Sequence, residues 1–91
     1  MQVTVEFKRR YLDRRMIDID HLVSSLDLDD FTPAVILGHQ VKGNAATFDF
    51  AHIAPLGLQI ENAAKNQNKD QVRTLVKMME SEIRLARLKF Q

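Results

Sequence analysis

The residues best suited to chemistry in this chain form one short pattern, in which His39 is followed by Lys42 and Gly43. A neutral imidazole is a nucleophile near pH 7, and its nitrogen can accept a phosphoryl group. Transfer of that group depends on positioning and charge balance more than on covalent machinery. On a helix, Lys42 would reach the phosphoryl oxygens and Gly43 would leave room beside them. The pattern alone is compatible with a phosphoryl acceptor and also with an ordinary surface histidine.

A helical projection places His39 on the solvent side of its helix. At about 100° per residue, Leu37, Val41 and Phe48 point away from it and form an apolar face. The side of His39 also carries three apolar residues, which are Val35, Ile36 and Ala46. Apolar residues are unusual on a solvated face, so we expect these three to form a docking surface for a partner.

The sequence offers little support for other kinds of chemistry. Its three glycines do not form a phosphate-binding loop, and its three histidines lie apart from one another. It has no cysteine, which excludes thiolate metal sites and disulfides. We therefore expect no metal, no cofactor and no ATP site, and not an enzyme that turns over alone.

Composition indicates a small cytoplasmic protein. The chain has 91 residues, with 13 basic and 12 acidic side chains, and this balance does not favour a nucleic-acid partner. Its apolar runs are too short to span a membrane, and Lys8-Arg9-Arg10 interrupts any apolar leader. We expect one domain over residues 1–91, monomeric, without a membrane or nucleic-acid partner.

Periodicity predicts a first helix that begins between Thr4 and Lys8, after an extended lead-in over Met1–Phe7, and ends near Asp27. Its expected apolar stripe consists of Leu12, Met16, Ile19, Val23 and Leu26. Its basic residues, which we expect to face outward, are Lys8, Arg9, Arg10, Arg14 and Arg15. This cluster is either a solvated face or a docking patch for an acidic partner.

The second helix is predicted to have Thr32 as its N-cap and Pro33 as its first residue. It runs to about Phe48, and Asp49 takes the turn, where Asp tolerates a left-handed conformation better than most residues.

The third helix is predicted from Ala51 to about Asn66, with Pro55 removing an early hydrogen bond and Gly57 allowing a neighbouring helix to approach. The fourth begins after Asn68, a good N-cap with Gln71 in the capping-box position. Its apolar stripe consists of Val72, Leu75, Val76, Met79, Ile83, Ala86 and Phe90. Four helices with short links predict an all-α, antiparallel up-down-up-down four-helix bundle.

The stretch Gly38–Phe50 resembles the signature of histidine-containing phosphotransfer (HPt) domains of two-component phosphorelays. Tyr11–Arg15 is similar to the first helix of small bacterial members, and Leu56–Ala64 to their third, so the likeness covers about residues 7–90. Two residues depart from the family pattern: Asp49 replaces the usual glycine of the turn, and Pro55 is uncommon at its position.

The resemblance implies that His39 accepts a phosphoryl group on Nε2 from a receiver-domain aspartate and passes it to another receiver. Lys42 would balance charge and Gly43 would provide access. Three further residues are implied as supporting neighbours, namely Gln40, Asn44 and Glu61.

The implied partner is the receiver domain of a response regulator, of a hybrid histidine kinase, or of both, and the receiver supplies the Mg²⁺. A competing interpretation is a helical adaptor that docks on signalling proteins without being phosphorylated. A DNA-binding helical domain is a third class, for which the basic cluster of the first helix is the one candidate surface.

Overall fold

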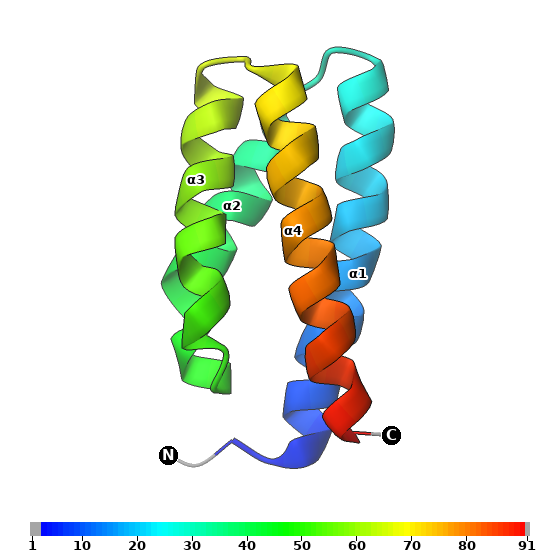
Figure 1. Ribbon diagram of the computed structural model, residues 1–91, viewed down its shortest axis with the longest axis vertical. Coiled ribbons are helices and arrows are strands. Elements are labelled where there is room, and N and C mark those ends of the chain that lie inside the picture. The colour runs from blue at the N-terminus through cyan, green and yellow to red at the C-terminus, as the bar shows by residue number, and fades with distance from the viewer. Residues whose placement is uncertain (1–2, 91) are drawn as a thin grey trace.

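The computed structural model describes residues 3–90, which form four α-helices in an antiparallel bundle (Figure 1). The helices are α1 (Val5–Asp27), α2 (Thr32–Asn44), α3 (Ala54–Lys65) and α4 (Lys69–Arg87). Short 3₁₀ turns follow α2, precede α3 and follow α4, and they are η1 (Ala46–Phe48), η2 (Ala51–Ile53) and η3 (Leu88–Phe90). The predicted all-α, up-down-up-down bundle is confirmed.

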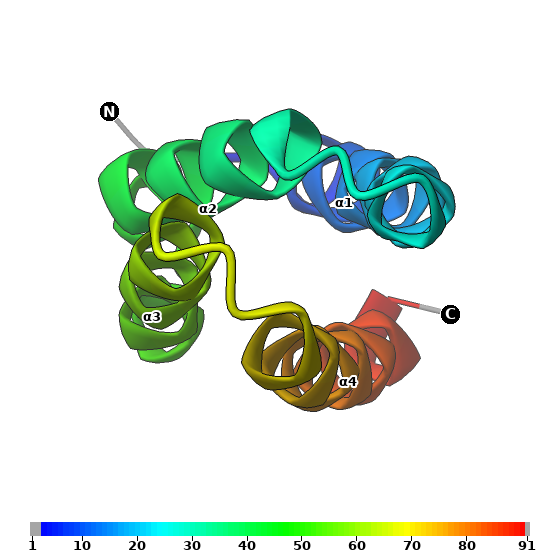
Figure 2. The same cartoon turned by 90° about the horizontal axis from the view of Figure 1, so that it is seen from above.

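Each helix lies beside its neighbours in the chain, and α1 closes the ring against α4 (Figure 2). Consequently α2 and α4 occupy diagonal corners. The largest fully buried side chains come from all four helices and from η2: Leu12, Ile19, Leu22, Leu26, Val41, Ile53, Ile60, Val72, Val76, Met79 and Ile83. Burying a side chain of this size contributes roughly 1.5–3 kcal/mol, so this core is the main source of stability. Within residues 3–90, no helix is both long and apolar enough to cross a membrane.

Side chains cap two of the helices at their starts. The Thr4 hydroxyl accepts a hydrogen bond from the backbone N–H of Phe7 before α1. The side-chain amide oxygen of Asn68 accepts a hydrogen bond from the backbone N–H of Gln71 at the start of α4, which confirms the predicted N-cap. Each of these bonds satisfies an N–H that has no partner within its own helix.

The apolar stripe predicted for α4 is buried from Val72 to Ala86, while Phe90 is half-buried. In α1 the stripe is rotated slightly from the prediction, because Leu22 is fully buried whereas Val23 is 39% exposed. Arg15 is also buried, contrary to the expectation that the arginines face outward. Its guanidinium lies 4.9 Å from the centre of the Tyr11 ring and 2.9 Å from Asp18.

The boundaries of α2 differ from the prediction at both ends. Thr32 is the first helical residue and Phe31 is the N-cap, since the Phe31 carbonyl oxygen accepts the N–H of Val35. The carboxylate of Asp30 accepts the Thr32 N–H at 3.0 Å. The α-helix stops at Asn44, before Phe48, and tightens into η1. Asp49 then has φ = 68°, the left-handed conformation that the sequence predicted for this turn.

The start of α3 also corrects the prediction. The segment from Ala51 forms the 3₁₀ turn η2, and the α-helix begins at Ala54. Pro55 therefore occupies the first turn of α3, where its missing N–H breaks no helical hydrogen bond.

A contact between two glycines sets the distance between α2 and α3. A Cβ on Gly38 would lie 2.6 Å from the carbonyl oxygen of Gly57, and a Cβ on Gly57 would lie 2.7 Å from the backbone nitrogen of Lys42. Neither position has space for a side chain, so the two backbones touch. The predicted close approach at Gly57 is confirmed, and Gly38 supplies the other half of it.

Candidate functional site

His39 follows Gly38 on α2 and presents its ring to solvent. Its side chain is 67% exposed, while Leu37 and Val41 on the opposite face of the helix are buried. The orientation predicted from the helical projection is therefore the one observed.

The partner of the ring is Glu61 on α3. The Nδ1 atom of His39 lies 3.0 Å from Oε2 of Glu61, whose side chain is only 5% exposed. Lys42 donates to the other carboxylate oxygen, Oε1, at 2.8 Å, and Lys65 lies 3.3 Å from Oε2. One buried carboxylate thus holds three nitrogen-bearing side chains from α2 and α3.

The charge of Glu61 follows from these contacts. Its pKa is lowered to about 2, above all by the hydrogen bond from Lys42 and also by those from His39 and Lys65, while burial acts in the opposite direction. At neutral pH the carboxylate is therefore ionised.

An ionised carboxylate fixes the tautomer of the ring beside it. It can only accept hydrogen bonds, so Nδ1 of His39 must carry the proton that lies between the two groups. In the neutral imidazole the lone pair then belongs to Nε2. This arrangement leaves a nucleophilic nitrogen on an exposed ring, and the contact of Nδ1 with Glu61 fixes the orientation of that ring.

The glycine contact places these groups together. Gly38 is the residue before His39, and Gly57 lies one helical turn before Glu61. With the two backbones touching at this point, the short reach of a glutamate side chain is enough to bring its carboxylate to the imidazole.

Gly43 opens onto empty space. A Cβ built at this position would meet no atom within 4 Å beyond its chain neighbours and the backbone of its own helix, in contrast to the crowded positions of Gly38 and Gly57. A side chain at position 43 would therefore meet no neighbouring element, and the use of this space by a partner of His39 stays a prediction.

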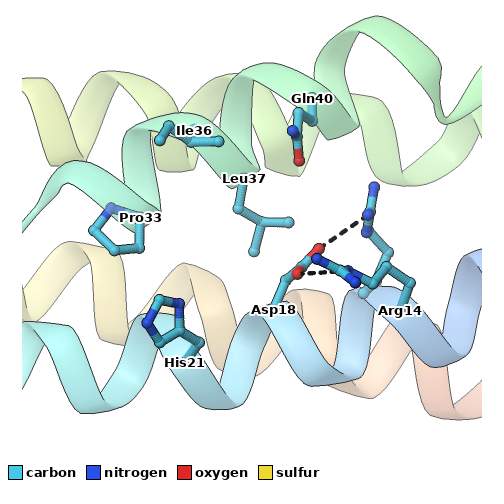
Figure 3. Close-up of a pocket in the computed structure, with 8 residues that line it drawn as sticks. Arg14, Asp18, His21, Pro33, Ile36, Leu37 and Gln40 are labelled. Atoms are coloured by element: carbon cyan, nitrogen blue, oxygen red, sulfur yellow. Dashed lines mark hydrogen bonds and ion pairs between the residues drawn. The ribbon is translucent and has the colours of Figure 1, made fainter.

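Gln40 and Asn44 lie away from the carboxylate. Gln40 lines an open groove between α1 and α2, in which Figure 3 shows it with Ile36 on one wall and Asp18 on the other. The amide oxygen of Asn44 accepts a hydrogen bond from the Tyr11 hydroxyl at 2.7 Å. Burial raises the pKa of Tyr11, which keeps this donor protonated. Asn44 therefore ties α2 to α1.

The three apolar residues expected to form a docking surface are exposed to different degrees. Ile36 is 50% exposed and Ala46 is exposed, whereas Val35 is partly buried against the core. Ile36 and Ala46 thus offer free apolar surface on the helix and turn that flank His39.

Lys65 is the site residue that sequence reasoning missed. Its spacing of four residues from Glu61 on one helix was the available signal. Among residues 3–90, no group of three or more metal-ligating side chains could hold a metal ion.

Comparison with known proteins identifies the family. The sequence matches the Hpt domain family over residues 6–89, which is nearly the whole chain. No curated protein and no solved structure gave a significant match. Hpt domains are phosphocarriers of phosphorelays that interact with receiver domains and lack an ATP site of their own. The four-helix bundle predicted from the sequence is also the fold of this family. The chain therefore belongs to the Hpt domain family.

Proposed function

We propose that this protein is a histidine phosphocarrier in which Nε2 of His39 accepts a phosphoryl group from a receiver-domain aspartate and passes it to another receiver. The observation that carries the proposal is the 3.0 Å contact between Nδ1 of His39 and the ionised carboxylate of Glu61. That contact leaves the lone pair on the exposed nitrogen, which is what a nucleophile needs.

The bonds that form and break in the transfer step belong to the imidazole and the phosphorylated aspartate. The Nε2 lone pair attacks phosphorus, the Nε2–P bond forms, and the bond from phosphorus to the aspartate oxygen breaks as the carboxylate leaves. The ring then carries positive charge with a proton still on Nδ1, and Glu61 stabilises that charge. In the reverse direction the same proton makes the imidazole a better leaving group.

The neighbours of His39 have complementary roles in this proposal. Lys42 lies one turn along α2 and balances the negative charge of the phosphoryl oxygens. Gly43 leaves room for the partner, and Ile36 and Ala46 with Val35 provide the apolar surface on which the receiver docks. Residues 1–91 act as one monomeric domain in the cytoplasm, and Mg²⁺ enters with the receiver.

The test is phosphoryl transfer from a panel of phosphorylated receiver domains to the wild type, to His39→Gln and to His52→Gln. His52 is the matched control because it is also an exposed histidine. We expect acid-labile, alkali-stable label on the wild type and on His52→Gln, and none on His39→Gln.

Equal labelling of His39→Gln and the wild type would refute the assignment of the acceptor. A folded wild-type protein that binds a receiver without taking label would favour the adaptor interpretation instead.

A further inference from the structure

Glu61 contacts more positive charge than is needed to neutralise one carboxylate. Lys42 and Lys65 both contact it, and it also accepts from His39, so two ammonium groups share a single negative charge. Lys42 alone, at 2.8 Å, already forms the shorter ion pair. The site before phosphorylation therefore holds one positive charge in excess.

Lys65 stands close to the reacting ring. Its ammonium nitrogen and Nδ1 of His39 contact the same carboxylate oxygen, Oε2, at 3.3 and 3.0 Å. Because both nitrogens contact the same oxygen, their separation is at most the sum of these two distances. The Lys65 side chain is 58% exposed, so its flexible stem can turn toward solvent and toward the ring.

The excess positive charge of this cluster would be balanced when His39 is phosphorylated. A phosphoryl group adds a charge of about −1.5 to −2 near neutral pH. Together with the carboxylate of Glu61, it would face a charged ring and two lysines. Without Lys65, Lys42 would be the one ammonium group that this cluster offers to both anions.

We propose that Lys65 is a second cation for the phosphoryl group on His39, held in readiness by Glu61 until that group arrives. This inference rests on the proposed function of His39. On phosphorylation the Lys65 ammonium moves from Oε2 to the phosphoryl oxygens, while the Nδ1–H of the charged ring keeps its place on Glu61. The exchange leaves both anions paired, and its effect is to stabilise the phosphorylated carrier.

A plain helix-surface ion pair is the alternative explanation of the Lys65 contact, because residues four apart on a helix often pair. The two explanations differ in what they predict for the phosphorylated protein. A surface pair would affect only folding stability, whereas a phosphoryl cation would change the properties of the phosphoryl group itself.

The experiment compares Lys65→Gln and Lys65→Arg with Lys77→Gln, which removes the same charge from an exposed position on α4, the helix diagonal to α2. Each protein is phosphorylated with phosphoramidate, whose P–N bond breaks as the Nε2–P bond forms and ammonia leaves. Phosphorus NMR then gives the second pKa of the phosphoryl group, and transfer from a phosphorylated receiver gives the equilibrium constant.

For Lys65→Gln we expect a raised phosphoryl pKa and a transfer equilibrium shifted toward the receiver by about two- to fivefold, as for a partly exposed charge pair. Lys65→Arg keeps the charge and should retain wild-type values. The difference should shrink as salt is added, since exposed charges are screened.

Nitrogen NMR of His39 before phosphorylation separates a direct role from an indirect one. We expect Nδ1 to remain protonated in Lys65→Gln, because Lys42 still holds Glu61. A change of tautomer there would show that Lys65 acts through Glu61 and would overturn the proposal.

The remaining outcomes are distinct. If the wild type is labelled on His39 and Lys65→Gln behaves like Lys77→Gln, the role of Lys65 is wrong and the carrier function stands. If phosphoramidate and receivers all leave His39 unlabelled, both proposals fall.

Discussion

Gly43 has no structural reason to be glycine. It lies in the last turn of α2 with φ in the ordinary negative range, and a Cβ there would have no neighbour within 4 Å outside the backbone of its own helix and its chain neighbours. Glycine inside a helix costs up to about 1 kcal/mol relative to alanine, so the fold would be more stable with a side chain at this position. In the proposed function, this empty space gives the receiver room to approach His39.

We therefore predict opposite effects of Gly43→Ala on stability and on transfer. The free energy of unfolding of the variant should rise by roughly 0.5–1 kcal/mol. The variant should accept phosphoryl groups from a receiver at least about tenfold more slowly, because the added methyl group displaces the partner. Denaturation and transfer kinetics measure the two effects.

Ser81→Ala on the exposed face of α4 is the control for that prediction, since it also raises helix propensity but lies away from His39. It should stabilise the protein and leave transfer unchanged. A Gly43→Ala protein with wild-type transfer rates would show that the space beside His39 is not used.

At the scale of the helices, the contact of Gly38 with Gly57 determines the geometry of the site. It lets α2 and α3 approach until backbone meets backbone, next to His39 and one turn from Glu61. A larger residue would have to push the helices apart, and the carboxylate would move away from the ring.

Gly57→Ala should accordingly destabilise the protein by about 1–3 kcal/mol, the range for overpacking a tight contact. It should also weaken the preference of His39 for a proton on Nδ1. Denaturation and nitrogen NMR test the two expectations. Gly43→Ala makes the same chemical change in open space, so equal effects of the two substitutions would contradict the argument.

Local patterns predicted the helices and the acceptor candidate, because periodicity and the spacing of His39, Lys42 and Gly43 are properties of single segments. Glu61 was the least prominent of the predicted supporting residues and Lys65 was missed. Their importance depends on how closely α3 approaches α2, which is a property of the pair. Which residue of α3 faces the ring cannot be predicted from α2 alone.

The exact ends of the helices could likewise be predicted only in part from local sequence. Pro33 does lie in the first turn of α2, although it is the second helical residue and not the first as predicted. Pro55 was placed inside a helix because nothing local distinguishes the 3₁₀ turn η2 from an α-helical turn. Arg15 was expected in solvent on the basis of its charge, and its burial depends on how α1 packs in the bundle. Its partners, the Tyr11 ring and Asp18, lie four residues before it and three after it on the same helix, so their contacts with it could have been predicted from helix spacing.

For the molecule as a whole, Glu61 links folding to pH. Its pKa is about 2 in the folded protein, against an ordinary value of 4.5. A carboxyl group whose pKa is lowered by folding stabilises the protein at any pH above the pKa of that group in the unfolded state. This stabilisation is lost as the pH falls from about 4.5 to about 2. The pKa of Asp29, lowered above all by the hydrogen bond from Lys69, acts in the same direction.

We predict that Glu61→Gln is less stable than the wild type at pH 7 and that this difference narrows steadily below pH 4.5. Denaturant titrations at a series of pH values provide the measurement, and Asp29 is unchanged in both proteins, so its contribution cancels. A difference that stayed constant down to pH 2 would mean that the charge of Glu61 does not contribute to stability.

The contact of His39 with Glu61 also has a consequence for folding kinetics. It joins residues 22 positions apart on consecutive helices, so only a short loop must close to form it. The α1–α4 contacts connect opposite ends of the sequence and require a far longer closure. The helical hairpin of α2 and α3 can therefore assemble early and persist while the ends of α1 or α4 open transiently. The reactive tautomer would then survive local unfolding elsewhere in the bundle, because every group that fixes it belongs to that hairpin.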